Sequence, residues 1–353
     1  MRGVKKAVVN LEPYTVPQDF SKVKLNQNES PADIPADIKE EIFARLRQVS
    51  WNRYPWEEAP RLIEGISRYT DFPSSGIMAG NGSNELIQTL MYAVCDSGDR
   101  IVTVRPGFSV YKRVATVMNI RVTEVPLKEN FSFDVEAMVE KARRAKLVIF
   151  ATPNNPTGTV LPVEEIERIA RHTDGVVAVD EAYYEFHQKT AQELINEREN
   201  IVVLRTFSKA LSLAGIRLGY LLGRKDLVKE IRKAKLPFSI GQFQQIAGEV
   251  ILEKKKFIEE NTERIIREKE RLWTGLMKTP GIYPVNSCAN FILFQSEYMS
   301  SEKLYTRLHE NGVIVRRFED PSLKNMLRVT VGTQEENRFF LEKLNRAAEG
   351  YIS

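Results

Sequence analysis

The sequence is poor in the residues that form disulfides and metal sites. It contains only two cysteines, Cys95 and Cys288, and three histidines. A single widely spaced pair of thiols excludes a disulfide-rich scaffold, and we expect both to be small buried thiols in a reducing compartment. The scattered histidines do not match the ligand spacing of a zinc site, so no metal is expected.

Long apolar runs and charge of one sign are also lacking. No stretch approaches the roughly 18 consecutive apolar residues of a membrane span, and no apolar segment follows the first residues as in a secretory signal. The 51 basic and 47 acidic residues leave a net charge of +4, and no basic block is interleaved with aromatic residues as a nucleic-acid groove requires. We therefore expect a cytoplasmic protein that binds neither membranes nor nucleic acid.

What the sequence does contain is a regular alternation of apolar runs and helical segments. Between about residues 77 and 234 the expected strands are Ile101–Val104, Arg121–Val125, Leu147–Ala151, Val176–Val179, Ile201–Leu204 and Leu218–Leu222. Because these runs are mostly apolar on both faces and are separated by amphipathic segments, we predict an α/β fold. Its large domain has a mostly parallel sheet covered by helices on both sides.

The sequence pattern changes after residue 243, where long charged helical sequence runs to about Lys278. A smaller α/β unit is expected after it, with strands at Phe291–Phe294, Val313–Arg316 and Leu327–Val331, a helix at Glu302–Glu310, and a last helix that begins with a capping box at Thr333–Glu336. We predict an N-terminal arm or part of the small domain over residues 1–45, a large domain over 46–255 and a small domain over 256–353. The first 40 or so residues are expected to pack on the small unit and on a partner subunit.

Polar residues gather where the predicted strands end. Asn155 follows one strand, Asp180 and Tyr183 follow the next, and Lys209 lies just beyond a third. In open sheets of this kind ligands bind beyond the carboxyl ends of the strands. Together with Arg217, these are the side chains that a pyridoxal 5′-phosphate (PLP) enzyme requires.

Lys209 and Asp180 are the predicted centre of the chemistry. PLP enzymes hold the cofactor aldehyde as a Schiff base on a lysine, whose amine later moves a proton at the substrate α-carbon. Lys209 stands between Ser208 and Ala210 after a buried strand, which favours this role over that of a solvated loop lysine. Asp180 would keep the pyridine nitrogen protonated. Glu181 is its rival, because only one of two neighbours at a strand end points inward, and a helix N-cap is the other role open to Asp180.

The remaining cofactor contacts are assigned by the donors that PLP needs. Tyr183 and Asn155 are placed to donate hydrogen bonds to the phenolic oxygen of the ring, and Phe108 either stacks on the ring or belongs to the core. The phosphate is expected at the start of a helix, on the amides of Ser83 and Asn84. The donors expected to complete this phosphate site are the hydroxyls of Thr206 and Ser208 and the guanidinium of Arg217.

These motifs resemble those of the fold type I aminotransferases of classes I and II. The segments that carry the resemblance are Asn154–Gly158, Val179–Tyr183, Thr206–Ala210 and Ala214–Arg217. Further segments resemble the histidinol-phosphate aminotransferases, namely Glu12–Tyr14, Lys24–Glu29, Asn52–Pro55 and Leu327–Thr333. The resemblance extends from about residue 11 to residue 349.

The resemblance implies a homodimer with shared sites. Tyr54 would reach the cofactor phosphate of the partner subunit. Arg328 would bind the carboxylate of glutamate or the phosphate of histidinol phosphate, with Arg316 and Tyr14 beside that substrate phosphate. The sequence departs from the family pattern at Arg317, where an acidic or polar residue is common, and at Trp51 and Trp56, which flank the Tyr54 motif.

The activity implied is transamination between L-histidinol phosphate and 2-oxoglutarate, giving imidazole-acetol phosphate and L-glutamate, in histidine biosynthesis. The alternatives within the fold are an aminotransferase for aromatic or other amino acids and an enzyme like threonine-phosphate decarboxylase. A non-catalytic regulator is disfavoured because Lys209, Asp180 and Tyr183 are all present and no DNA-binding domain is appended. A dehydrogenase is disfavoured because no Gly-x-Gly-x-x-Gly motif follows an early strand.

Overall fold

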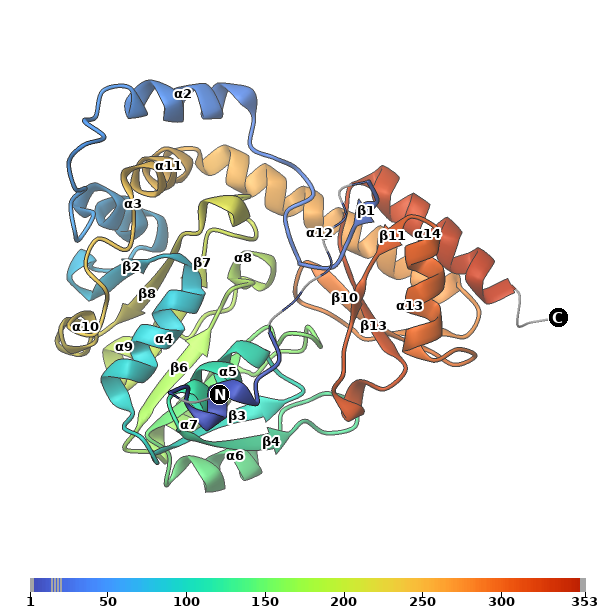
Figure 1. Ribbon diagram of the computed structural model, residues 1–353, viewed down its shortest axis with the longest axis horizontal. Helices are drawn as coiled ribbons and strands as arrows, with labels where there is room; N and C mark the ends of the chain where they lie inside the picture. The colour runs from blue at the N-terminus through green and yellow to red at the C-terminus, as the bar shows by residue number, and fades with distance from the viewer. Residues whose placement is uncertain (1–2, 14, 16, 18, 20, 350–353) are drawn as a thin grey trace.

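The computed structural model describes residues 3–13, 15, 17, 19 and 21–349, which form two α/β units of unequal size (Figure 1). The larger unit is built on a seven-stranded sheet of order β2-β8-β7-β6-β5-β3-β4. Its strands are β2 (Ile77–Gly80), β3 (Arg100–Arg105), β4 (Arg121–Pro126), β5 (Leu147–Ala151), β6 (Val176–Asp180), β7 (Ile201–Thr206) and β8 (Gly219–Gly223). Strand β8 alone runs opposite to the other six strands of this sheet, so the mostly parallel sheet is confirmed.

Helices cover both faces of this sheet, as the apolar strands require. One face packs against α4 (Gly82–Val94), α5 (Ser109–Val117) and α10 (Lys225–Arg232). The other packs against α3 (Pro60–Thr70), α6 (Val135–Ala142), α7 (Val163–Arg171), α9 (Leu194–Glu197) and α11 (Gln242–Glu253). Every residue of β5 and of β7 is buried, because such strands are shielded from water on both sides.

The strand of the large sheet that the sequence pattern missed is β2. Its four residues, Ile77-Met78-Ala79-Gly80, contain a single β-branched side chain and end in glycine, so they carry little local preference for a strand. It pairs antiparallel with β8 and is buried throughout. Pairing in the sheet, not local propensity, makes this segment a strand.

The smaller unit contains a four-stranded antiparallel sheet of order β12-β13-β10-β9. Its strands are β9 (Ile282–Pro284), β10 (Phe291–Ser296), β12 (Arg316–Arg317) and β13 (Met326–Thr330), and it packs with α12 (Lys255–Lys278), α13 (Ser301–Glu310) and α14 (Gln334–Glu349). The single strand predicted at Val313–Arg316 is wrong. That segment divides into β11 (Val313–Ile314) and β12, because the two halves pair with different strands in different sheets.

The last helix begins as its capping box predicts. The backbone N–H of Thr333 donates to Glu336 Oε2 at 2.7 Å, and the N–H of Glu336 donates to Thr333 Oγ1 at 3.2 Å. These reciprocal bonds satisfy two donors that a helix start leaves without intrahelical partners. The long helix α12 runs alongside both units (Figure 1).

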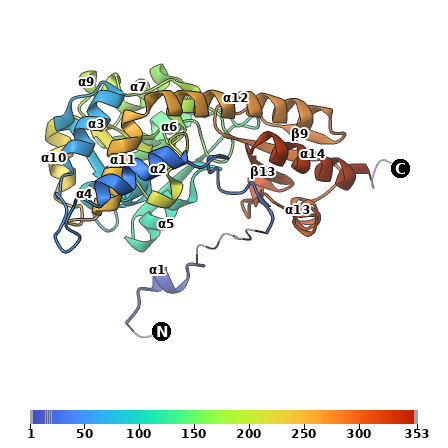
Figure 2. The same ribbon diagram turned by 90° about the horizontal axis from the view of Figure 1, so that it is seen from above.

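The N-terminal segments divide between the two units. Strand β1 (Val23–Lys24) pairs in parallel with β11, which agrees with the expected packing of this segment on the small unit. Helix α2 (Ala36–Leu46) instead packs on α11 of the large unit, and the short α1 (Lys6–Val9) lies beside α5 at the margin of the molecule (Figure 2). The expected packing on the small unit therefore holds for β1, whereas α1 and α2 contact the large unit. The apolar stripe Ile38, Ile42 and Leu46 is buried against the large unit.

The shorter elements are η1 (Ser74–Gly76), α8 (Tyr184–His187), η2 (Ala214–Ile216) and η3 (Pro321–Leu323). No helix in the described part of the chain is long and apolar enough to cross a bilayer.

Both cysteines are free thiols, but only Cys95 is buried. Cys288 is half-buried, which corrects the expectation of two buried thiols. The three-part division of the chain remains a prediction.

Candidate active site

A cavity of about 1520 Å³ opens at the carboxyl ends of β5, β6 and β7, between the two units. It is lined by every predicted site residue that the structure describes except Tyr54, and these are Ser83, Asn84, Phe108, Asn155, Asp180, Tyr183, Thr206, Ser208, Lys209, Arg217, Arg316 and Arg328. Tyr14 lies outside the described residues. The cavity is large enough for a cofactor and a substrate together.

Asp180 is the carboxylate that faces this cavity. It ends β6, is 2% exposed, and accepts hydrogen bonds from Tyr111 Oη at 2.7 Å and from the backbone N–H of Ala182 at 3.1 Å. Burial raises the pKa of Asp180 to about 6, although these hydrogen bonds favour the ionised form. A buried carboxylate that lines the cavity and has a donor on each oxygen is suited to pair with a cationic ring nitrogen.

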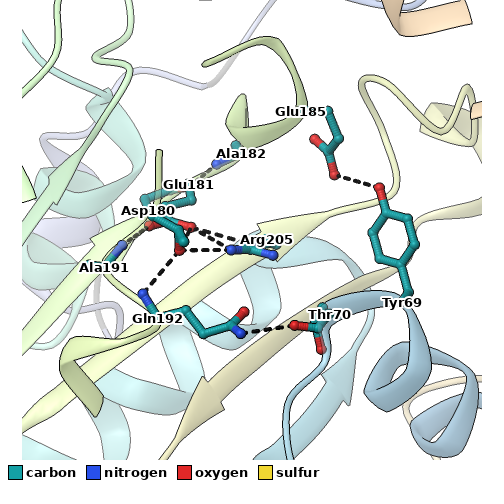
Figure 3. A network of polar contacts seen from close by, with 10 residues as sticks. Tyr69, Thr70, Asp180, Glu181, Ala182, Glu185, Ala191, Gln192 and Arg205 are labelled. Atoms are coloured by element: carbon teal, nitrogen blue, oxygen red, sulfur yellow. Dashed lines mark hydrogen bonds and ion pairs between the residues drawn. The ribbon is translucent and has the colours of Figure 1, made fainter. Parts of the chain in front are cut away.

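Glu181, the rival carboxylate, pairs with a residue of the neighbouring strand β7 instead of lining the cavity (Figure 3). It is 1% exposed, does not line the cavity, and pairs with Arg205 at 2.9 Å. Thr190 Oγ1 and the backbone N–H of Ala191 also donate to it, at 2.8 and 2.7 Å. The alternation of side chains along a strand separates the two neighbours, which leaves Asp180 as the residue that can reach a ligand.

Lys209 projects into the cavity from the loop after β7. Its amine donates to the backbone carbonyl of Gln27 at 2.9 Å, from a segment far earlier in the chain. Burial, together with a smaller contribution from the positive charge of Arg328, lowers the pKa of Lys209 to about 7. A lysine with a pKa in this range has a large neutral fraction at physiological pH, as a nucleophile or proton carrier requires.

Tyr183 is the centre of a hydrogen-bond chain that crosses the cavity. Its phenolic oxygen accepts from Asn28 Nδ2 at 2.9 Å and from Asn155 Nδ2 at 3.3 Å. Asn155 Oδ1 in turn accepts from Arg328 Nη1 at 2.5 Å, while Arg328 Nη2 donates to the carbonyl of Asn26 at 2.9 Å. This chain ties the large sheet, the N-terminal segment and the small sheet together around one point.

The predicted phosphate donors converge at the start of α4. Arg217 Nη1 donates to Ser208 Oγ at 3.3 Å, and Thr206 Oγ1 donates to Ser208 Oγ at 3.0 Å. Gly82 has φ +75°, and a Cβ there would lie 2.7 Å from Arg217 Nη2, so a larger residue would intrude on this guanidinium. The result is a set of hydroxyl, guanidinium and helix N-terminal N–H donors suited to an anion.

The chemistry of the cavity wall fits PLP on a further observation. Asn26 Oδ1, Gln27 Oε1 and Thr103 Oγ1 are buried, have no hydrogen-bond partner among the described residues, and belong to residues that line the cavity. Buried polar atoms are normally satisfied, so these atoms indicate room for a polar ligand. With an anion site, a buried carboxylate and a lysine of lowered pKa in the same cavity, the residues present match the phosphate, the ring nitrogen and the aldehyde of the cofactor.

Three site residues were missed by the sequence reasoning. Tyr111 supplies the hydroxyl that holds Asp180 and packs edge-on against Phe108 with ring centroids 5.4 Å apart. Asn28 and Gln27 contact Tyr183 and Lys209 from the N-terminal segment. The only signal for Asn28 and Gln27 was their place in the Lys24–Glu29 motif, and nothing in the pattern of α5 singled out Tyr111.

Two predicted residues are less enclosed than the rest. Tyr54 is 81% exposed and stacks on Phe238 with ring centroids 4.7 Å apart. Arg316 lines the cavity and lies opposite Arg328 in the β12–β13 pair, so both guanidinium-bearing residues occupy one end of the cavity. Arg317 also lines the cavity and contacts Glu302 at 3.9 Å.

Among the described residues, no group of three or more His, Cys, Asp or Glu side chains gathers as a metal site would.

Comparisons with known proteins agree on one family. A family model described as aminotransferase class I and II matches residues 21–344. A histidinol-phosphate aminotransferase from Clostridium kluyveri is 38% identical over 346 residues, covering 97% of each chain. Another from Thermococcus gammatolerans is 39% identical over 347 residues, covering 98% of each.

Solved structures give the same result for the fold. The histidinol-phosphate aminotransferase from Clostridium acetobutylicum matches with a TM-score of 0.86 at 25% identity, over 93% of this chain and 99% of that one. The enzyme from Sinorhizobium meliloti, solved in complex with pyridoxal-5′-phosphate, matches with a TM-score of 0.89 over 99% of this chain and 98% of that one. At 21% identity that second likeness concerns the fold alone.

Proposed function

The chain belongs to the class I and II aminotransferases, and its relatives of 38–39% identity are histidinol-phosphate aminotransferases; on that premise we propose that it transfers an amino group between L-histidinol phosphate and 2-oxoglutarate. The products would be imidazole-acetol phosphate and L-glutamate, within histidine biosynthesis. The fold is that of the fold type I PLP-dependent enzymes, as predicted. The observation that carries the proposal is the meeting of Lys209, Asp180 and Arg328 in one cavity.

PLP is the cofactor of this family, and the proposed chemistry of the chain is arranged around it. When bound, PLP supplies an electron sink that allows a proton to leave the substrate α-carbon. Lys209 would hold the cofactor and then carry that proton, because its amine is partly neutral near pH 7. Asp180 would pair with the ring nitrogen and keep it protonated, while Tyr183 and Asn155 would bind the phenolic oxygen.

The phosphate of the cofactor would lie at the start of α4. Ser83 and Asn84 would offer backbone N–H groups there, since the first N–H groups of a helix have no intrahelical partner. The other proposed contacts are the hydroxyls of Thr206 and Ser208, the guanidinium of Arg217, and Phe108 against the ring face. These non-covalent contacts would hold the cofactor in addition to Lys209.

The arginine end of the cavity would bind the substrate anions. Arg328 would bind the carboxylate of glutamate or the phosphate of histidinol phosphate, and Arg316 with Tyr14 would bind that phosphate. Guanidinium groups suit both anions because their N–H groups form paired hydrogen bonds. Two cationic residues at one end favour a phosphorylated substrate over its unphosphorylated analogue.

We also propose that the active unit is a homodimer in which Tyr54 completes the partner's site. Tyr54 is exposed and absent from its own cavity, and Trp51 and Trp56 beside it are 80% and 77% exposed. Phe238 and Leu236 extend this apolar patch, at 40% and 71% exposed. Large exposed apolar patches of this kind mark interfaces between proteins. A cytoplasmic location is proposed with it, because both cysteines are free thiols.

A panel of amino donors tests the substrate assignment. The donors are L-histidinol phosphate, L-histidinol, phenylalanine and glutamate, each with an excess of a suitable 2-oxo acid. We expect kcat/KM for histidinol phosphate to exceed that for histidinol by about 10²-fold or more, because a missing phosphate leaves the arginine pair without its anion. Equal rates with both, or faster turnover of phenylalanine than of either, would reject histidinol phosphate while leaving the aminotransferase assignment intact.

A further inference from the structure

The end of β6 carries two buried carboxylates in succession, and only one of them belongs to the cavity. Asp180 is 2% exposed and Glu181 is 1% exposed. Two like charges this close in a dry environment oppose each other's ionisation, and PLP chemistry needs Asp180 to be ionised. The structure must therefore compensate Glu181 on its own side of the sheet.

Arg205 provides that compensation from the neighbouring strand. It lies on β7, is 2% exposed, and donates from Nε to Glu181 Oε2 at 3.0 Å. Its Nη2 donates to Thr190 Oγ1 at 2.8 Å, and Thr190 Oγ1 donates to the same carboxylate oxygen at 2.8 Å. With the Ala191 N–H on Oε1, both oxygens of Glu181 have partners (Figure 3).

The strands themselves set this geometry. The N–H of Glu181 donates to the carbonyl of Leu204 at 2.8 Å, which places Glu181 beside Arg205. Successive side chains of a strand alternate between faces, so fixing Glu181 against Arg205 on one face directs Asp180 to the other. The Glu181–Arg205 pair on the far face thereby sets the direction of the Asp180 side chain on the cavity face.

Arg205 also faces other titratable groups. Its guanidinium carbon lies 3.6 Å from the centroid of the Tyr184 ring. Glu185 and Tyr220 act on it electrostatically, and Tyr69 Oη donates to Glu185 Oε1 at 3.4 Å. Burial raises the pKa of Glu185 to about 7. Glu181 is the carboxylate that contacts Arg205 directly, at 2.9 Å.

We propose that Arg205 is a positioning residue for Asp180. By neutralising and fixing Glu181 on the far face of β6, it keeps Asp180 ionised and directed into the cavity. This rests on the role proposed above for Asp180 beside the ring nitrogen. Arg205 does not line the cavity, and it acts through Glu181 and the strand end.

The test uses the pH dependence of ligand binding by the full-length apoprotein. The ligand is pyridoxamine 5′-phosphate, which has an amine in place of the aldehyde and so forms no bond to Lys209. Its dissociation constant is measured by calorimetry from pH 5 to pH 9 in the wild type and in Arg205→Met, Glu181→Gln and the double variant. Asp180→Asn identifies the part of the profile that belongs to Asp180, and Arg224→Met, which breaks an exposed Arg–Glu pair of 3.3 Å with Glu199, is the matched control.

The expected result is an ordered set of midpoints for the loss of affinity at acid pH. Arg205→Met leaves the Glu181 charge uncompensated, which raises the pKa of Asp180 and moves the midpoint up by about one pH unit or more. Glu181→Gln removes a like charge and moves the midpoint down. The double variant removes both charges and returns the midpoint close to that of the wild type. Arg224→Met leaves it unchanged.

A purely structural role would give a different pattern. Single variants that both shift the midpoint in the same direction, or leave it unmoved, would overturn the inference, as would a double variant with no recovery. If Arg205→Met does not fold, the near-isosteric Glu181→Gln decides, and an unchanged midpoint in that variant counts against the role of Arg205. If Asp180→Asn still loses affinity for the ligand at acid pH as the wild type does, the proposed role of Asp180 is overturned, and this inference with it.

Discussion

The two ends of the cavity differ in how far one chain encloses them. At the cofactor end, Asp180, Thr206 and Ser208 are 2%, 5% and 7% exposed, and strands of the large sheet fix their positions. At the substrate end, Arg328 is 5% exposed, but the side chains of Arg105 and Arg317, which also line the cavity, are 45% and 39% exposed. One end is built by the core of the large unit, and the other by short elements that join the two units.

This difference in exposure separates the residues that carry out the reaction from those that select the substrate. Electrostatic interactions strengthen where water is excluded, so the buried end is the place for charges that control proton transfer. The open end must admit and release substrates, and its charges are partly screened by water. Changes at the buried end are expected to reduce catalysis for every substrate, whereas changes at the open end are expected to alter which substrate is preferred.

Removal of the Lys209 amine is the most severe test of the buried end. Lys209→Ala should lower kcat by about 10⁴-fold or more for all amino donors, because both the covalent anchor and the proton carrier are lost. Borohydride reduction of the wild type should fix the cofactor to Lys209. The control is Lys269→Ala, which removes another lysine bonded to a backbone carbonyl, at 2.8 Å from Ser287, and should stay active. A label recovered on any other lysine would end the assignment.

Asp180→Asn should have the next largest effect. We expect the cofactor to remain bound while transition-state stabilisation falls by about 3 kcal/mol, or about 10²-fold in kcat, since a neutral ring is a poor electron sink. The loss should be equal for histidinol phosphate and glutamate, because both reactions use the same ring. Steady-state kinetics with each donor measure it, and near-normal turnover would contradict the role of Asp180.

The two arginines of the substrate end should respond differently to substitution. Arg328→Ala should lower kcat/KM for histidinol phosphate and for glutamate alike by about 10- to 100-fold, as expected when a charge-assisted hydrogen bond is lost. Arg316→Ala should reduce the rate with histidinol phosphate more than the rate with glutamate. Arg346→Ala, whose guanidinium pairs at 2.8 Å with Glu342 on α14, is the control and should change neither rate. Equal losses for both substrates in Arg316→Ala would remove the distinction between the two arginines.

The lowered pKa of Lys209 predicts how cofactor attachment depends on pH. Because burial favours the neutral amine, attachment of PLP to the apoprotein should rise about tenfold per pH unit below pH 7 and level off above it. Stopped-flow absorbance records the rate. A rise that continues to pH 10 would mean that Lys209 titrates like a solvated lysine and that the buried end is wetter than its geometry implies.

Tyr54→Phe should have the smallest effect, because it removes one exposed hydroxyl. Retention of PLP on dilution should weaken by roughly 1 kcal/mol, the net value of one hydrogen bond, while Tyr92→Phe, at another exposed tyrosine, should change nothing. Mixing Tyr54→Phe subunits with Lys209→Ala subunits should create heterodimers with one site that carries neither change. If confirmed heterodimers retain PLP no better than the Tyr54→Phe parent, Tyr54 does not serve the partner's site.

The comparison between the two ends also explains which predictions from the sequence succeeded. Strands such as Leu147–Ala151 were found with their observed bounds, because a fully buried strand shows its apolar pattern locally. Asp180 and Lys209 were located for the same reason, since each follows such a strand. The segment Val313–Arg316 was misread because its two halves pair with strands hundreds of residues apart, and no local pattern records that division.

Local sequence alone determined most strands of the large sheet and the presence of a lysine, a carboxylate and anion-binding donors near their ends. Tertiary structure alone decided between Asp180 and Glu181, because the choice depends on Arg205 on the neighbouring strand. It also brought Asn28 to Tyr183 across 155 residues and Arg328 to Asn155 across 173. Periodicity reports only which face of an element is buried. Which side chains meet in a cavity depends on how the elements pack against one another.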